Sequence, residues 1–167
     1  MAKTEYWLRG PLPEYPVLVQ PVAHALLQAV DEIEDLLMDF DASKLWIKPN
    51  GMASVGFHLE HIAGVMDRLF TYAAGEQLTE VQLQYLKQEG AEKPGTTKED
   101  LLGALKRQLD LCLSSLKNTA PENLTEIRFV GRKLIPSTMI GLFVHTAEHT
   151  MRHTGQLLVT VKCLPNM

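Results

Sequence analysis

Histidine spacing is the feature of this sequence that could support chemistry. Five of the six histidines fall into two tight groups: His58 with His61, and His145 with His149 and His153. Residues four apart on an α-helix lie one turn above each other on the same face, so the second group forms a ladder. Neutral imidazole nitrogen binds zinc, nickel, copper and iron(II), which makes divalent metal binding the chemistry to consider.

A ladder of buried imidazoles needs partners, because each unsatisfied nitrogen costs about 1–3 kcal/mol. Two histidines at i and i+4 can hold one ion, and the third ligand must then come from another helix. The pair His58 and His61 is the only other histidine pair in the chain. The alternative is a partly exposed ladder in which every imidazole makes an ordinary hydrogen bond. No HExxH motif is present, so the zinc-protease arrangement is not expected.

Four long segments carry apolar residues at three- and four-residue steps, which predicts amphipathic helices. We expect them over about 22–40, over about 53–74, from Thr97 through the stripe that ends at Leu116, and from Ser137 or Thr138 to about 161. A short helix is expected over 80–88, because Thr79 and Gln82 resemble a capping box. The sequence therefore predicts an all-α four-helix bundle, with residues 1–167 as a single domain and 1–20 as an extended N-terminal arm.

The connection between the second and third long helices decides the topology. At about twenty residues it is long enough to cross the bundle, which permits an up-down-down-up order. The sequence alone does not select this order over a simple up-and-down bundle. Residues 122–136 are expected to be a partly extended loop closed by Pro136, with Arg128, Arg132 and Lys133 in solvent.

Composition excludes several classes of protein. Sixteen basic and twenty acidic residues give a net charge of −4, which argues against a nucleic-acid binder. The sequence has no long apolar run and no signal-peptide pattern in its first twenty residues, so we expect a cytoplasmic protein without membrane contact. Cys112 and Cys163 lie far apart in the chain and are expected to be reduced.

Two segments resemble the DinB/YfiT-like superfamily of metalloenzymes, which is unrelated to the DNA polymerase of similar name. They are residues 54–64 (SVGFHLEHIAG) and 149–156 (HTMRHTGQ), of which the second is the more specific. The resemblance implies a four-helix bundle with up-down-down-up topology. It also implies one divalent metal bound by a histidine of the second helix and two histidines of the fourth.

Carried over to this sequence, the resemblance assigns three metal ligands: His61, His149 and His153. His58 and His145 each lie one turn before a ligand, so they are candidates for the pocket lining, for a second shell or for alternative ligands. Gln156 is the candidate for orienting a ligand or a bound water. Glu60 and Glu148 each precede a ligand by one residue, and we expect both on solvated helix faces.

Three histidines leave coordination positions open, as catalytic metal sites do. Relatives include transferases and isomerases that use thiols such as bacillithiol or mycothiol. The resemblance therefore implies a metal-dependent enzyme, a thiol-dependent S-transferase or a hydrolase, that acts on a small molecule. Zinc and nickel are the first metals to consider, and a homodimer is expected. The alternatives are a non-catalytic metal-binding or stress-associated protein, and a purely structural helical protein.

Overall fold

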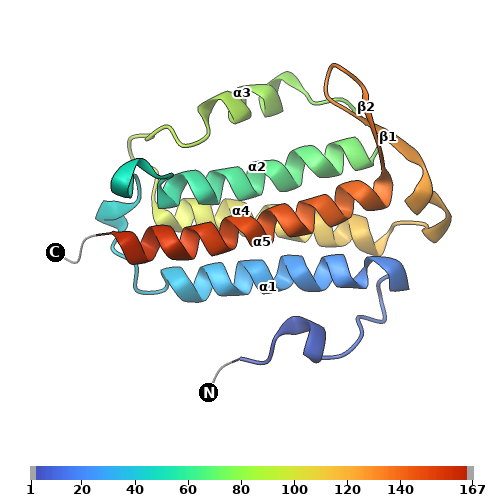
Figure 1. Cartoon of the computed structure of the whole chain (residues 1–167), viewed down its shortest axis with the longest axis horizontal. Coiled ribbons are helices and arrows are strands. Elements are labelled where there is room, and N and C mark those ends of the chain that lie inside the picture. The colour runs from blue at the N-terminus through green and yellow to red at the C-terminus, as the bar shows by residue number, and fades with distance from the viewer. Residues whose placement is uncertain (1–2, 165–167) are drawn as a thin grey trace.

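The computed structural model describes residues 3–164, in which four long helices lie side by side (Figure 1). These helices are α1 (Gln20–Leu37), α2 (Val55–Ala73), α4 (Lys98–Lys117) and α5 (Met139–Cys163). Helices α1 and α2 each pack against both α4 and α5. This arrangement confirms the predicted all-α four-helix bundle.

The direction of the helices gives the bundle an up-down-down-up order. Figure 1 shows α1 and α5 running in one direction and α2 and α4 running in the other. Because α2 and α4 are parallel, residues 74–97 must return along the length of the bundle. This crossover contains the short helix α3 (Glu80–Gln88), which lies along α2. The long crossover predicted between the second and third long helices is therefore confirmed.

Capping boxes start the two helices on either side of the crossover loop. The Thr79 side chain accepts the backbone N–H of Gln82, whose own side chain accepts the backbone N–H of Thr79. Thr97 and Asp100 make the same reciprocal pair at the start of α4. Each box satisfies two backbone donors that the first helical turn leaves free. Both N-termini lie where the sequence predicted them.

Replacing Thr97 by alanine should lower the free energy of unfolding by about 1 kcal/mol, the usual cost of a lost N-cap. The reason is that the backbone N–H of Asp100 loses its acceptor, the Thr97 hydroxyl, at 3.1 Å. Urea denaturation measures the change. Ser115→Ala, at an exposed position later in the same helix, is the control and should leave stability within about 0.5 kcal/mol. Equal stability of the two variants would contradict the role of the cap.

The core lies between the four long helices and is closed at one end by an aromatic pair. The rings of Phe70 and Phe143 lie 4.9 Å apart, centroid to centroid. The four long helices supply all but one of the largest fully buried apolar side chains among the described residues, the other being Leu124: Leu26, Ile33, Leu37, Leu59, Ile62, Met66, Leu105, Leu116, Phe143 and Leu157. Within residues 3–164, no helix is both long enough and apolar enough to cross a membrane.

Helix α1 ends earlier than predicted, at Leu37 instead of Phe40. The ammonium group of Lys98 donates to the backbone oxygens of Leu37 (3.0 Å), Met38 (3.3 Å) and Phe40 (3.4 Å). A cation that binds the last carbonyl groups satisfies acceptors that the helix leaves free. The contact comes from the start of α4, so no local pattern near Phe40 contains it.

The prediction of a loop over 122–136 was wrong in part. Residues Pro121–Thr125 form a 3-10 helix, and β1 (Ile127–Val130) pairs antiparallel with β2 (Ile135–Thr138) in a hairpin. Phe129 pairs with Pro136, which is tolerated because a two-stranded sheet has only edge strands. The hairpin is fastened to the bundle by Arg128, whose Nε donates to the backbone oxygen of Ala73 at 2.7 Å.

The N-terminal segment before α1 contains no α-helix in its described part. Two 3-10 helices, Tyr6–Leu8 and Val17–Val19, are separated by a stretch rich in proline and glycine. The segment contacts α1, where the side-chain oxygen of Gln28 accepts the backbone N–H of Tyr6 at 2.9 Å.

Candidate metal centre

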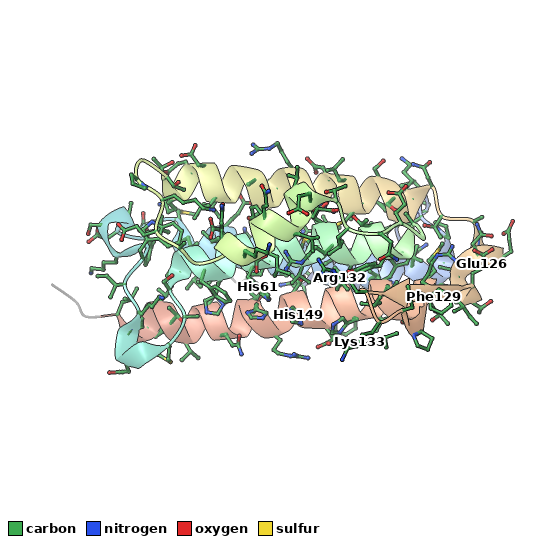
Figure 2. All side chains as sticks on the ribbon, turned by 90° about the horizontal axis from the view of Figure 1, so that it is seen from above. His61, Glu126, Phe129, Arg132, Lys133 and His149 are labelled. Carbon is green, nitrogen blue, oxygen red and sulfur yellow. The ribbon has the colours of Figure 1, made fainter. Side chains whose placement is uncertain are left out.

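Three histidines from two helices converge on the solvent side of the α2–α5 interface. His61 comes from α2, and His149 and His153 lie one turn apart on α5. The Nε2 atoms of His61 and His149 are 3.1 Å apart, and one ring nitrogen from each of the three lies within 4.8 Å of the others. Figure 2 shows His61 and His149 beside each other between the two ribbons. All three side chains are half-buried.

The cluster fits a divalent metal ion in spacing and in protonation. Two nitrogens bound tetrahedrally to one zinc ion at about 2.0–2.1 Å lie about 3.4 Å apart, close to the separation of His61 and His149. Burial lowers the pKa of His149, and it lowers the pKa of His153 to about 4. Both imidazoles are therefore neutral at pH 7, which is the form that binds metal.

His58 is buried directly behind the cluster. Its Nδ1 lies 3.2 Å from Nδ1 of His153, and its Nε2 lies 3.4 Å from the hydroxyl of Thr160. Burial, with a smaller effect of nearby His61, lowers the pKa of His58 to about 4. The structure thus places His58 against one of the three converging histidines and outside their group.

His145 and Gln156 lie on the exposed side of α5. His145 pairs with Glu148 through a 2.7 Å contact, and these two exposed residues form with the half-buried His149 a second group that could hold an ion. Glu148 also accepts from Arg152 at 2.6 Å, as expected for a solvated helix face. Gln156 is exposed and lines a pocket beside His58.

The ring of His61 is fixed by contacts on two sides. Phe57 stacks on it, with ring centroids 5.1 Å apart and ring planes at 12°. Its Nδ1 lies 2.6 Å from Oε2 of Glu89, the first residue after α3. The other carboxylate oxygen of Glu89 accepts from Nη1 of Arg68 at 2.5 Å, and the Glu89 side chain is only 4% exposed. No pattern in the sequence points to Glu89 as part of the site.

Glu60 is a second buried carboxylate, and the prediction that it faces solvent was wrong. Glu60 is only 2% exposed, and its carboxylate accepts hydrogen bonds from the backbone N–H of Gly90 at 2.7 Å and from the ammonium group of Lys93 at 2.5 Å. The hydroxyl of Tyr85 donates to the Glu60 backbone oxygen. Because an unpaired buried carboxylate is costly, these contacts fasten the end of α3 and the following loop onto α2.

A pocket of about 560 Å³ lies beside the cluster, between α5 and the segment that precedes α2. Its walls include Met52, His58, Arg152, Gln156, Val159 and Thr160. The lining is mainly apolar, and its polar members include the buried His58 and the exposed Arg152. A volume of this size can hold a small organic molecule.

At the turn of the hairpin are two of the basic residues expected in solvent. Arg132 and Lys133 are both exposed (Figure 2). Arg128 differs from them because its contact with α2 leaves its side chain only 14% exposed.

A four-helix bundle with three histidines between its second and last long helices defines a class of helical proteins with a candidate metal site. The sequence model of the DinB superfamily matches residues 18–157, and the chain belongs to this superfamily. The chain is similar in structure to a conserved protein from Enterococcus faecalis, with a TM-score of 0.69 and 17% sequence identity. That similarity covers 87% of this chain and 95% of the other. No curated protein matches the chain in sequence.

Proposed function

We propose that the protein is a metal-dependent enzyme of the DinB superfamily that transfers a small thiol to an organic electrophile. The observation that carries this proposal is the convergence of His61, His149 and His153. Within residues 3–164, no carboxylate or thiol completes this group as a fourth ligand. Three neutral protein ligands leave positions for water or substrate, as in catalytic metal sites.

The histidines of the site would bind the metal, and the residues of the neighbouring pocket would bind the substrate. A divalent metal held by the three imidazoles would lower the pKa of a bound thiol, so that the thiol gives its proton to water at neutral pH. The thiolate sulfur would then form a bond to carbon of the electrophile as the bond from that carbon to its leaving group breaks. Met52 and Val159 offer apolar surface to the electrophile in the neighbouring pocket. Arg152 also lines this pocket, and its guanidinium would bind a carboxylate of the substrate or of the thiol. Zinc and nickel are the metals to test first.

Metal content tests the first part of the proposal. Protein purified without a histidine tag should contain about one equivalent of a transition metal, and a chelator should remove it. Adding zinc at about 100 times its dissociation constant should then stabilise the apoprotein by about 2.7 kcal/mol, which thermal melting detects. A metal-free protein whose melting temperature ignores both zinc and chelator would refute the metal centre.

Activity tests the second part. Bacillithiol, mycothiol, glutathione and cysteine are each incubated with a panel of electrophiles, and loss of the thiol is followed with metal-loaded and chelator-treated protein. We expect at least one combination to react faster with the loaded protein only. If the protein binds metal but no combination exceeds the rate with apoprotein, the non-catalytic metal-binding alternative replaces the enzyme.

A further inference from the structure

We propose that Glu89 is a positioning residue that sets the tautomer of His61, so that the Nε2 lone pair of His61 faces the metal. The inference rests on the proposed metal centre for its function, but the tautomer itself is a property of the metal-free protein. It assigns a role at the site to a residue of the crossover, outside the four long helices. Glu89 would act through His61 and would not touch the metal or the substrate.

The hydrogen-bond chemistry of Glu89 fixes where the proton of His61 lies. An ionised carboxylate only accepts hydrogen bonds, so the 2.6 Å contact with Oε2 requires a proton on Nδ1 of His61. In the neutral imidazole the Nε2 atom is then bare, and this atom lies 3.1 Å from Nε2 of His149. Metal-bound histidines typically donate their other ring N–H to such a partner.

Arg68 gives the carboxylate a fixed orientation. The Arg68 side chain is 9% exposed, and its guanidinium donates to Oε1 of Glu89 and leaves Oε2 for His61. A guanidinium can only donate, so the atom that faces Arg68 must be an acceptor. Gly64 makes room for this arrangement, because a Cβ atom at that position would collide with Oε1 of Glu89 and lie 2.6 Å from Nη1 of Arg68.

The backbone that carries Glu89 is held on its other side. The contacts of Glu60 with the N–H of Gly90 and with Lys93 anchor the two flanks of the loop that follows Glu89. Gly90 has φ +77°, and a Cβ there would lie 2.7 Å from the Phe57 ring that stacks on His61. These contacts hold the crossover against α2, and the Glu89 carboxylate therefore lies beside Nδ1 of His61.

The variant Glu89→Gln shows whether Glu89 sets the tautomer of His61 or only holds the crossover against α2. Arg68 forces the amide oxygen of the new glutamine toward itself, so the amide NH₂ faces Nδ1 of His61. Nδ1 must then accept, and the proton moves to Nε2, the atom that should bind the metal. A residue that only fastened the crossover would not invert the tautomer.

The experiment measures two quantities in wild type, Glu89→Gln and the matched control Glu92→Gln, which changes an exposed glutamate of the same loop. Nitrogen NMR of the chelator-treated proteins reports the tautomer of His61, and competition with a chromophoric chelator reports zinc affinity. We expect the Nδ1–H form in wild type and control and the Nε2–H form in Glu89→Gln. Zinc affinity should fall about 10- to 100-fold in Glu89→Gln only.

A double variant provides the rescue. In Glu89→Gln with Arg68→Met the amide is free to turn its oxygen toward His61, so the Nδ1–H tautomer and part of the zinc affinity should return. If Glu89→Gln does not fold, Glu89→Asp takes its place. Aspartate is one methylene shorter, so its carboxylate lies farther from His61 and zinc affinity should fall. The proton resonance of the His61 Nδ1–H should also move upfield from its position in wild type, because the short hydrogen bond that deshields this proton is lost.

The outcomes distinguish this inference from the proposed function. An unchanged His61 tautomer in folded Glu89→Gln, or zinc affinity within about twofold of wild type, overturns the role of Glu89. Wild-type protein that shows the Nδ1–H tautomer and binds no metal overturns the metal centre and leaves the hydrogen bond as a structural contact only.

Discussion

Alanine in place of His61, His149 or His153 should reduce the metal content of the purified protein from about one equivalent to less than about a tenth. With two imidazoles left, the ion loses one of only three protein bonds. Among the described residues, no fourth histidine, cysteine or carboxylate belongs to the group in which the ligand atoms lie within 4.8 Å of one another. Elemental analysis of untagged protein measures the metal, and circular dichroism checks that each variant is folded.

Two further histidine variants serve as controls for this loss. His24→Ala changes a histidine of α1 that lies outside the cluster, and it should keep its metal. His145→Ala should keep its metal as well, because His145 is exposed and pairs with Glu148. Full retention of metal by His153→Ala, or loss in His145→Ala, would move the site to the exposed group on α5.

Gly64→Ala should have the second-largest effect, on stability and metal affinity together. The new Cβ collides with Glu89 and lies within 2.6 Å of Arg68 and 2.9 Å of the Tyr85 ring, so the buried ion pair must move. Overpacking of this kind costs typically 1–3 kcal/mol, and we expect about 2. As Glu89 withdraws from His61, zinc affinity should fall about tenfold. Urea denaturation and chelator competition measure the two effects.

Gly103→Ala is the matched control for this substitution, because it places the same methyl group in the interior of α4. There the nearest atom is Nη1 of Arg107 at 3.3 Å, the end of a flexible side chain. Removing a mid-helix glycine should stabilise the protein by about 0.5–1 kcal/mol and leave zinc affinity unchanged. If Gly64→Ala behaved like Gly103→Ala, the close approach of the crossover to α2 would be wrong.

The bundle was predictable because its helices carry their burial pattern in the sequence. Leu105, Leu109, Cys112 and Leu116 repeat at helical spacing, and all of them are buried on α4. The hairpin was not predictable, because each strand has four residues and one contains Pro136. Its position depends on the contact between Arg128 and the end of α2, which no local pattern contains.

The candidate site likewise contains residues that a local pattern predicts and residues that only tertiary contacts bring in. The spacing of His149 and His153 places both on one face of α5, which follows from helical geometry alone. Glu89 differs, because it lies in a polar connection without periodicity and meets His61 only after the crossover has docked. Glu60 was misassigned for the same reason, since the groups that bury it, Gly90 and Lys93, belong to that connection.

The parallel course of α2 and α4 has a consequence for how such a protein can change over time. In this chain the returning segment lies against α2, outside the four-helix core, and it passes beside the histidine cluster where Glu89 contacts His61. Changes at the exposed positions of residues 74–97 can therefore alter the surroundings of the candidate site, whereas Glu89 and Thr97 also contribute to stability. Away from the residues that anchor it, this connection can therefore change the surroundings of the site while the long helices keep their packing.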